Sequence, residues 1–268
     1  MIDLHTHHER CGHAEGSLEE VARNAYAAGA RIFGWSDHAP LFADSEDHPR
    51  PGTQMARSQW DGYLSEAASV RRQLQRELPG FDIRIGVEAD YLPGTEDVYR
   101  DGLARPELDY VLGSVHEVGE WHIYKPRTFE DLDDPDAFHS GYWRALRGAA
   151  GSGLFDVLSH LDAIKAMAPA ACSDMRGEIE ATLDCIADTG IAVEINGSGL
   201  SKAAELFPSP AIVAGLVRRD VPITLGSDAH HPDQLGRGYA EGIALLHRLG
   251  RERIVTFRGR EAEWVEPG

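Results

Sequence analysis

Short apolar segments alternate with amphipathic segments along the chain, which leaves few folds open to it. Strands are expected directly before His5 and over residues 31–36, 83–88, 108–114, 154–159, 191–195 and 221–225. Helices are expected over residues 17–28, 58–78, 135–150, 175–188, 209–219 and 233–249. Strand–helix repetition with short links is typical of parallel βαβ units. Seven such units in a chain of 268 residues favour a closed α/β barrel over an open, doubly wound sheet.

Local signals support these elements. Ser17 and Glu20 have the spacing of a capping box, and Gly29 is expected to end that first helix. Pro210 is expected in the first turn of its helix. No Gly-x-Gly-x-x-Gly or phosphate-loop motif follows the first strand, which argues against a nucleotide-binding open sheet. Residues 117–135 are expected to form a long loop, and without a linker rich in Pro, Gly or Ser, residues 1–268 are expected to form one domain.

The composition excludes several classes of protein. The formal net charge is -18, and such an acidic surface repels phosphate backbones, so nucleic-acid binding is not expected. No apolar segment is long enough to span a bilayer, and no basic region leads into an apolar stretch as in a signal peptide. Three cysteines at irregular spacing argue against a disulfide framework and favour the reducing cytoplasm.

Histidine and carboxylate side chains follow nearly every expected strand. His5 and His7 are two residues apart, so on a strand they would point to the same side, and Asp228 and His230 repeat this spacing. The other strand ends and the first loop supply His13, Asp37, His38, Glu88, Asp90, His116, His160, Asp162 and Glu194. In a parallel barrel the C-terminal strand ends meet on one face, where such folds have their active sites. We therefore expect a metal site there.

The expected ligands are nitrogen and oxygen donors, which suit Zn, Mn or Fe. At three or four protein ligands for each ion, they would serve two or three ions. Clustered ions of this kind suit phosphoester hydrolysis, because they lower the pKa of bound water and neutralise phosphate oxygens. Cys11 lies among the histidines, but a thiolate fits poorly in such a set and is not expected as a ligand. Asp37 is expected to orient His38 or another imidazole.

Several segments resemble the motifs of a known family. They are Asp3–His7, Cys11–Gly16, Ser36–Pro40, Gly86–Tyr91, Gly113–His116, Ser159–His160 and Gly226–His230. With these segments, in this order, the chain resembles the PHP (polymerase and histidinol phosphatase) family and its histidinol-phosphatase branch. The resemblance implies a distorted seven-stranded, TIM-like (β/α)7 barrel. It also implies a metal-dependent phosphomonoesterase that hydrolyses L-histidinol phosphate to L-histidinol and phosphate in histidine biosynthesis.

The resemblance further implies a centre of three divalent metal ions. The first ion would be held by His5, His7, Glu88 and Asp228. Glu88 would bridge to the second ion, which His116 and His160 would also hold. The third ion would be held by His13, His38 and His230. A hydroxide that bridges the metals would attack phosphorus in line.

The sequence supports fewer expectations about the residues around the metal ligands. The substrate phosphate is expected to contact Ser198, Lys202 and Lys165. Asp228 or His230 is expected to assist the departure of the leaving group as an acid. The segment 196–202 departs from the histidinol-phosphatase branch, because relatives commonly have arginine where Ser201 stands.

Other functions remain open at this stage. The same site could act on nucleotides as a phosphatase or exonuclease, although the acidic surface and the lack of a second domain count against an exonuclease. A non-catalytic metal-binding barrel would keep the ions without turnover. A barrel with a single metal, as in amidohydrolases, would usually need a bridging lysine after a middle strand, and none is present. The expected partner is a small phosphate ester, and no particular oligomeric state is indicated.

Overall fold

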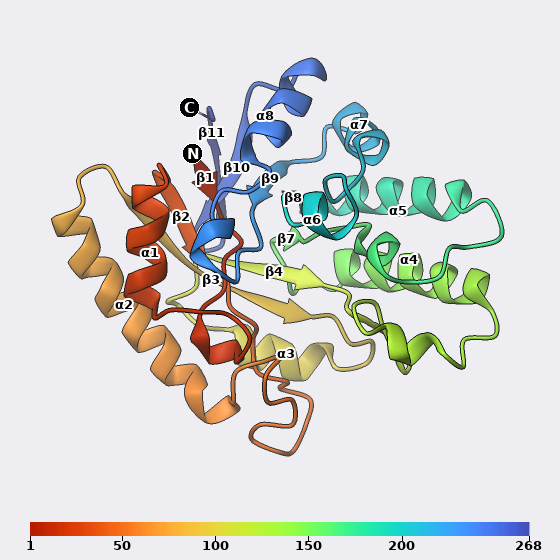
Figure 1. Cartoon of the computed structure of the whole chain (residues 1–268), viewed down its shortest axis with the longest axis horizontal. Helices are drawn as coiled ribbons and strands as arrows, with labels where there is room; N and C mark the ends of the chain where they lie inside the picture. Colours follow the sequence, from red (N-terminus) through yellow and green to blue (C-terminus); the bar gives the residue numbers. More distant parts are fainter. Residues whose placement is uncertain (268) are drawn as a thin grey trace.

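The computed structural model describes residues 1–267 and contains a seven-stranded sheet that curves into a nearly closed barrel (Figure 1). In order across the sheet, the strands are β1 (Ile2–Asp3), β2 (Ile32–Trp35), β3 (Asp82–Asp90), β4 (Tyr110–Ser114), β7 (Val157–Leu158), β8 (Ala192–Asn196) and β9 (Ile223–Gly226). Every neighbouring pair is parallel. At the seam, the Leu4 amide donates to the Leu225 carbonyl (3.1 Å). The expected seven-stranded barrel is thereby confirmed.

Helices cover the outside of this barrel (Figure 1). They are α1 (Leu18–Ala27), α2 (Trp60–Glu77), α3 (Glu96–Leu103), α4 (Pro135–Gly151), α5 (Arg176–Thr189), α6 (Gly199–Lys202), α7 (Pro210–Arg218) and α8 (Tyr239–Arg248). The expected capping box forms at α1, where Ser17 accepts from the Glu20 amide and Glu20 accepts from the Ser17 amide. Pro210 lies in the first turn of α7, as expected. None of the helices in the described residues combines the length and apolar character needed to cross a bilayer.

The interior of the barrel is organised around one phenol. Tyr110 on β4 is fully buried, and its hydroxyl donates to the carbonyl oxygens of Leu4 (2.6 Å) and Trp35 (3.1 Å). Gly34 and Gly86 leave the space for its ring. A Cβ atom on Gly34 would lie 2.2 Å from the Tyr110 hydroxyl oxygen, and one on Gly86 would lie 2.3 Å from the ring carbon that bears it. The Tyr110 side chain on β4 therefore contacts β2, β3 and the residue that follows β1.

Helices α3 and α6 and two hairpins were not expected from the sequence. Helix α3 follows β3 where no helix was predicted. A small hairpin of β5 (Glu117–Val118) and β6 (Trp121–His122) interrupts the segment expected as a loop. A second hairpin, of β10 (Ile254–Arg258) and β11 (Glu261–Val265), follows the last expected strand.

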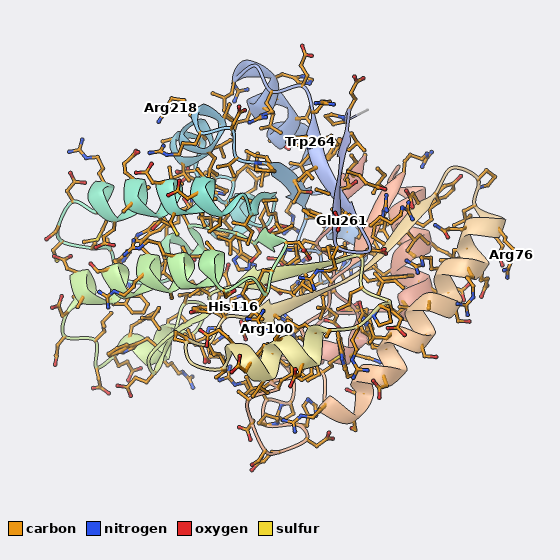
Figure 2. The ribbon with its side chains drawn as sticks, turned by 180° about the vertical axis from the view of Figure 1, so that it is seen from behind. Arg76, Arg100, His116, Arg218, Glu261 and Trp264 are labelled. Carbon is orange, nitrogen blue, oxygen red and sulfur yellow. The ribbon has the colours of Figure 1, made fainter. Side chains whose placement is uncertain are left out.

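Other boundaries shift for local reasons. The helix expected over residues 233–249 begins at Tyr239, because Pro232–Gln234 form a 3-10 turn and both Gly236 and Gly238 adopt positive φ angles. Viewed from behind, His116 lies inside the molecule whereas Arg76 and Arg218 lie at its periphery (Figure 2).

Candidate metal centre

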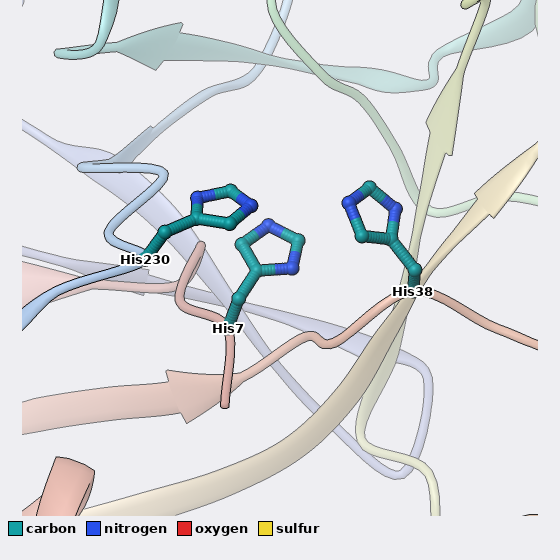
Figure 3. Close-up of side chains that lie close together, drawn as sticks. All are labelled: His7, His38 and His230. Atoms are coloured by element: carbon teal, nitrogen blue, oxygen red, sulfur yellow. The ribbon is translucent and has the colours of Figure 1, made fainter. Parts of the chain in front are cut away.

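The predicted metal ligands come together at the C-terminal end of the barrel. Three groups of them have ligand atoms within 4.8 Å of one another: His5, His7 and Asp228; Glu88, His116 and His160; and His7, His38 and His230. His13 joins the last group, because its Nε2 atom lies 3.0 Å from Nε2 of His230. The imidazoles of His7, His38 and His230 lie close to one another although they come from three separate segments (Figure 3).

Backbone pairing at the seam of the barrel positions the first group. Thr6 forms a parallel bridge with Ala229, and the Asp228 amide donates to the His5 carbonyl (2.8 Å). Asp228 has a φ angle of 56°, a left-handed conformation that aspartate tolerates better than most residues. The chain therefore turns sharply after β9, and one Asp228 carboxylate oxygen reaches to 3.3 Å from Nε2 of His7.

Glu88, at the end of β3, connects the groups. Its Oε2 atom lies 3.0 Å from Nδ1 of His38 and 3.4 and 3.5 Å from Nε2 of His5 and His7. Its Oε1 atom lies 3.1 Å from Nε2 of His160 and 3.7 Å from Nε2 of His116. A single buried carboxylate thus faces ligand atoms of every group, which is the geometry required of a bridging ligand.

Two orphaned nitrogen atoms test whether a cation fits this site. Nδ1 of His5 lies 2.8 Å from a Glu194 oxygen, and Nδ1 of His7 lies 3.3 Å from an Asp37 oxygen. Each carboxylate favours the proton on Nδ1, so the Nε2 lone pair of each ring points into the cluster. Both Nε2 atoms are buried without a hydrogen-bond partner. Buried polar atoms of this kind are rare, and a divalent ion would satisfy them.

The charges of the side chains support the same conclusion. Burial alone would lower the pKa of His7, but the surrounding carboxylates raise it to about 9, and they also raise the pKa of His5 well above its usual value. Burial lowers the pKa of His38 to about 3 and that of His230 to about 2. Burial would raise the pKa of Glu88, but the nearby imidazoles lower it well below its usual value. Without cations, protonated His5 and His7 must offset the buried carboxylates.

Glu194 on β8 was expected among the strand-end residues, but its role as a positioning residue could not be read from the sequence. Besides its contact with His5, it accepts hydrogen bonds from the His160 amide (3.1 Å) and the Asn196 side chain (2.9 Å). It is 1% exposed. An acidic residue inside a buried strand was the available signal, but nothing in the sequence shows which imidazole its side chain contacts. The carboxylate holds two ligands in place.

Replacing Glu194 with glutamine should weaken metal binding about 10- to 100-fold, because the amide no longer fixes the tautomer of His5. The change preserves the shape of the side chain and the contact to Asn196. Metal affinity should be measured by competition with a chromophoric chelator. A matched control is E180Q, on the exposed face of α5, where Glu180 pairs with Arg219. Equal metal affinities of E194Q and E180Q would contradict the role of Glu194.

Asp37 was expected to orient His38 or another imidazole, and the imidazoles that its carboxylate contacts are those of His7 and His8. Its carboxylate lies 3.3 Å from Nδ1 of His7 and 3.3 Å from Nε2 of His8, and it accepts from the Cys11 amide (3.1 Å). The Cys11 thiol donates to the His8 carbonyl (3.2 Å), and burial raises its pKa. Cys11 therefore stays a protonated core thiol, although it lies near His7 and Asp37.

A cavity of about 450 Å³ opens onto the ligand cluster. Of the residues expected to bind phosphate, Ser198 and Lys202 line it, and both contact Asp228 through its Oδ2 atom, at 2.9 and 3.0 Å. Lys165 is not among its lining residues. The Lys165 ammonium group instead binds the carboxylates of Asp162 and Glu205, both at 2.9 Å. His122 and Tyr124, from the segment after β4, also line the cavity.

The barrel and its ligand cluster together define a metal-binding α/β enzyme fold. The PHP domain family model matches residues 3–198, and the chain belongs to this family.

The relatives of the chain are similar over nearly its full length. It is 35% identical over 266 residues to a probable histidinol-phosphatase of Deinococcus radiodurans, with 98% of each chain covered. It is 25% identical over 261 residues to the histidinol-phosphatase of Bacillus subtilis, covering 88% of this chain and 96% of the relative. The histidinol phosphate phosphatase of Lactococcus lactis, solved with zinc, L-histidinol and phosphate, has the same fold, with a TM-score of 0.79 and 19% identity over 98% of each chain.

Proposed function

We propose that this chain is a metal-dependent phosphomonoesterase that hydrolyses L-histidinol phosphate to L-histidinol and phosphate. The observation that carries the proposal is the cluster of imidazoles and carboxylates around Glu88, at the base of a cavity large enough for a small ligand. The full-length similarity to a probable histidinol-phosphatase supports the choice of substrate. We also propose a cytoplasmic location, with which the free thiols of the three cysteines agree.

We assign the metal ligands as three sets. His5, His7, Glu88 and Asp228 form the first, Glu88, His116 and His160 the second, and His13, His38 and His230 the third. Divalent ions held in this way lower the pKa of water and neutralise the charge on a phosphoryl group. The protein contributes the fixed positions of these ligands, which Glu194, Asp37 and Asp90 orient through the Nδ1 atoms of His5, His7 and His116.

Asp228 and His230 act in this proposal as ligands and not as proton donors. Burial would raise the pKa of Asp228, but Lys202 and His5 lower it well below its usual value, so the carboxylate is ionised. The pKa of His230, about 2, leaves that imidazole neutral. Neither group carries an acidic proton near neutral pH. We therefore assign protonation of the leaving group to solvent within the cavity.

We assign the phosphate group of the substrate to the side of the cavity formed by Ser198 and Lys202. The Ser198 hydroxyl and the Lys202 ammonium group both lie beside Asp228, and so beside the first set of ligands. Lys165 is left out of this assignment, because two carboxylates and the Leu206 carbonyl already bind its ammonium group.

The test is phosphate release from L-histidinol phosphate, compared with a panel of nucleotides, by metal-loaded protein. A strong preference for L-histidinol phosphate is the expected result. Better turnover of nucleotides would keep the phosphatase chemistry and reject the substrate. Full metal occupancy without turnover of any ester would reject the enzyme in favour of a metal-binding barrel.

A further inference from the structure

Arg237 is a cavity-lining cation whose charge is not neutralised by a carboxylate in the described part of the chain. It lies between β9 and α8, on the same loop as His230, and it lines the cavity, as Ser201 and Lys202 do. One of its N–H groups donates to the Ser201 hydroxyl (2.9 Å). Most other arginines that contact a side chain do so through an ion pair, as Arg147 does with Glu178. A guanidinium left without such a pair, in a protein of charge -18, is available to an anion.

The backbone of Arg237 packs directly against Gly197, in the turn after β8 that also contains Ser198. A Cβ atom on Gly197 would lie 1.8 Å from the Arg237 carbonyl oxygen, so only glycine permits this approach. Gly238 has a φ angle of 74°, and a Cβ atom there would lie 2.5 Å from the Cα atom of Gly197. The loop after β9 and the turn after β8 are thus in direct backbone contact, which places the backbone of Arg237 close to that of Ser198.

The same loop connects Arg237 to the metal ligands. The Gln234 side chain accepts from the His230 amide (2.8 Å), and the Arg237 amide donates to the Gln234 carbonyl (3.0 Å). The Lys202 ammonium group forms an ion pair with Asp228 (3.0 Å) and lies 4.7 Å from the centre of the Tyr124 ring. Because Lys202 is already paired with a ligand carboxylate, a phosphate dianion needs a further donor on this side of the cavity.

We propose that Arg237 binds the phosphate group of the substrate, using the guanidinium N–H groups that Ser201 does not occupy. The inference rests on the proposed phosphatase function and adds to it the residue that holds the transferred group. A guanidinium presents its donors in a planar fork that matches two phosphate oxygens, which an ammonium group does not. Arg237 then binds the phosphoryl oxygens, and the metal ligands are left unchanged.

The test is the affinity of metal-loaded protein for inorganic phosphate, measured by isothermal titration calorimetry, together with kcat and KM for phosphate esters. R237M should bind phosphate about 10-fold or more weakly, because it loses a charge-assisted pair of hydrogen bonds. R237K should lose less than R237M, since it keeps the charge. The control is R218M, which removes an exposed arginine at the periphery of the molecule (Figure 2) and should bind phosphate as the unchanged protein does.

The variant S201A separates direct binding of phosphate by Arg237 from an effect of Arg237 on Ser201. S201A removes the hydrogen bond to Arg237 but keeps the guanidinium, so it should change phosphate affinity by no more than about 3-fold. If S201A weakens phosphate binding as much as R237M does, Arg237 acts through Ser201 and the proposal is wrong. Equal phosphate affinities of R237M and R218M would also overturn it, provided that metal content and circular dichroism are unchanged.

The affinity of these variants for inorganic phosphate does not depend on which alcohol the substrate ester contains. If the protein prefers another phosphate ester but R237M still binds phosphate weakly, the proposed substrate fails and Arg237 retains its role. If L-histidinol phosphate is the preferred substrate and R237M binds phosphate normally, the substrate stands and the inference about Arg237 fails.

Discussion

E88Q should lower the rate of phosphate release by about 10³-fold or more, because a bridging carboxylate supports several kcal/mol of charge stabilisation in a metal site. The two Glu88 oxygens face different imidazoles, with Oε2 3.0 Å from His38 and Oε1 3.1 Å from His160. Glutamine keeps the shape but replaces one oxygen with an N–H₂ group that cannot bind a cation. The substitution also removes a negative charge from the centre of the cluster, so metal content should fall together with activity.

The measurement needs both a rate and a metal analysis. The number of metal ions per protein molecule should be determined by elemental analysis of purified protein. Phosphate release should be followed at saturating substrate. E261Q makes the same chemical change on the exposed β11 strand and should leave both quantities unchanged. An E88Q protein with full metal content and more than a tenth of the original activity would show that Glu88 does not connect the metal sites.

The strand ends explain why so much of this site could be predicted from the sequence. In a parallel barrel, a residue that follows a strand must lie on the C-terminal face, so His5, Glu88 and His230 could be placed together without coordinates. The capping box of Ser17 was equally predictable, because it depends on residues three apart. Both inferences use distances along the chain that local geometry converts directly into distances in space.

What could not be predicted depends on contacts between distant segments. Glu194 and His5 are separated by 189 residues, and no spacing reveals that their side chains meet. The partners of Lys165 were hidden for a related reason: Glu205, which binds its ammonium group, comes from another loop. Arg237 has no motif of its own, because its place in the cavity depends on the close backbone contact between Gly197 and Gly238.

The missed elements had weaker but readable signals. The segment Ile254–Phe257 is apolar and β-branched, and the turn at Gly259 that follows it is typical of a hairpin. Helix α3 begins with Glu96 and Asp97, which favour a helix N-terminus, and it buries Tyr99 and Leu103. Short elements of this kind bury few side chains, so their periodicity is hard to separate from that of a loop.

Removing the metal ions with a chelator should abolish turnover and lower the melting temperature by about 10 °C at neutral pH. Ions that bind only the folded state at 1,000 times their dissociation constant contribute about 4 kcal/mol to stability, and for a chain of this size each kcal/mol corresponds to about 2–4 °C. Scanning calorimetry of metal-loaded and chelated protein measures the difference, and re-addition of Zn²⁺ should restore it. An unchanged melting temperature after verified metal removal would contradict the proposed metal centre.

The effect of chelation should grow as the pH rises from about 6.5 to 9. In the metal-free protein the pKa of His7 is raised to about 9, so the stability gained from its protonation is complete below the ordinary value of 6.5 and is lost as the pH approaches 9. Metal ligation requires the neutral imidazole, so metal affinity changes in the opposite direction and strengthens over the same range, with protons released on binding. The metal-loaded protein therefore keeps its stability where the chelated protein loses it, and a melting-temperature difference that shrinks toward pH 9 would show that His7 does not bind metal.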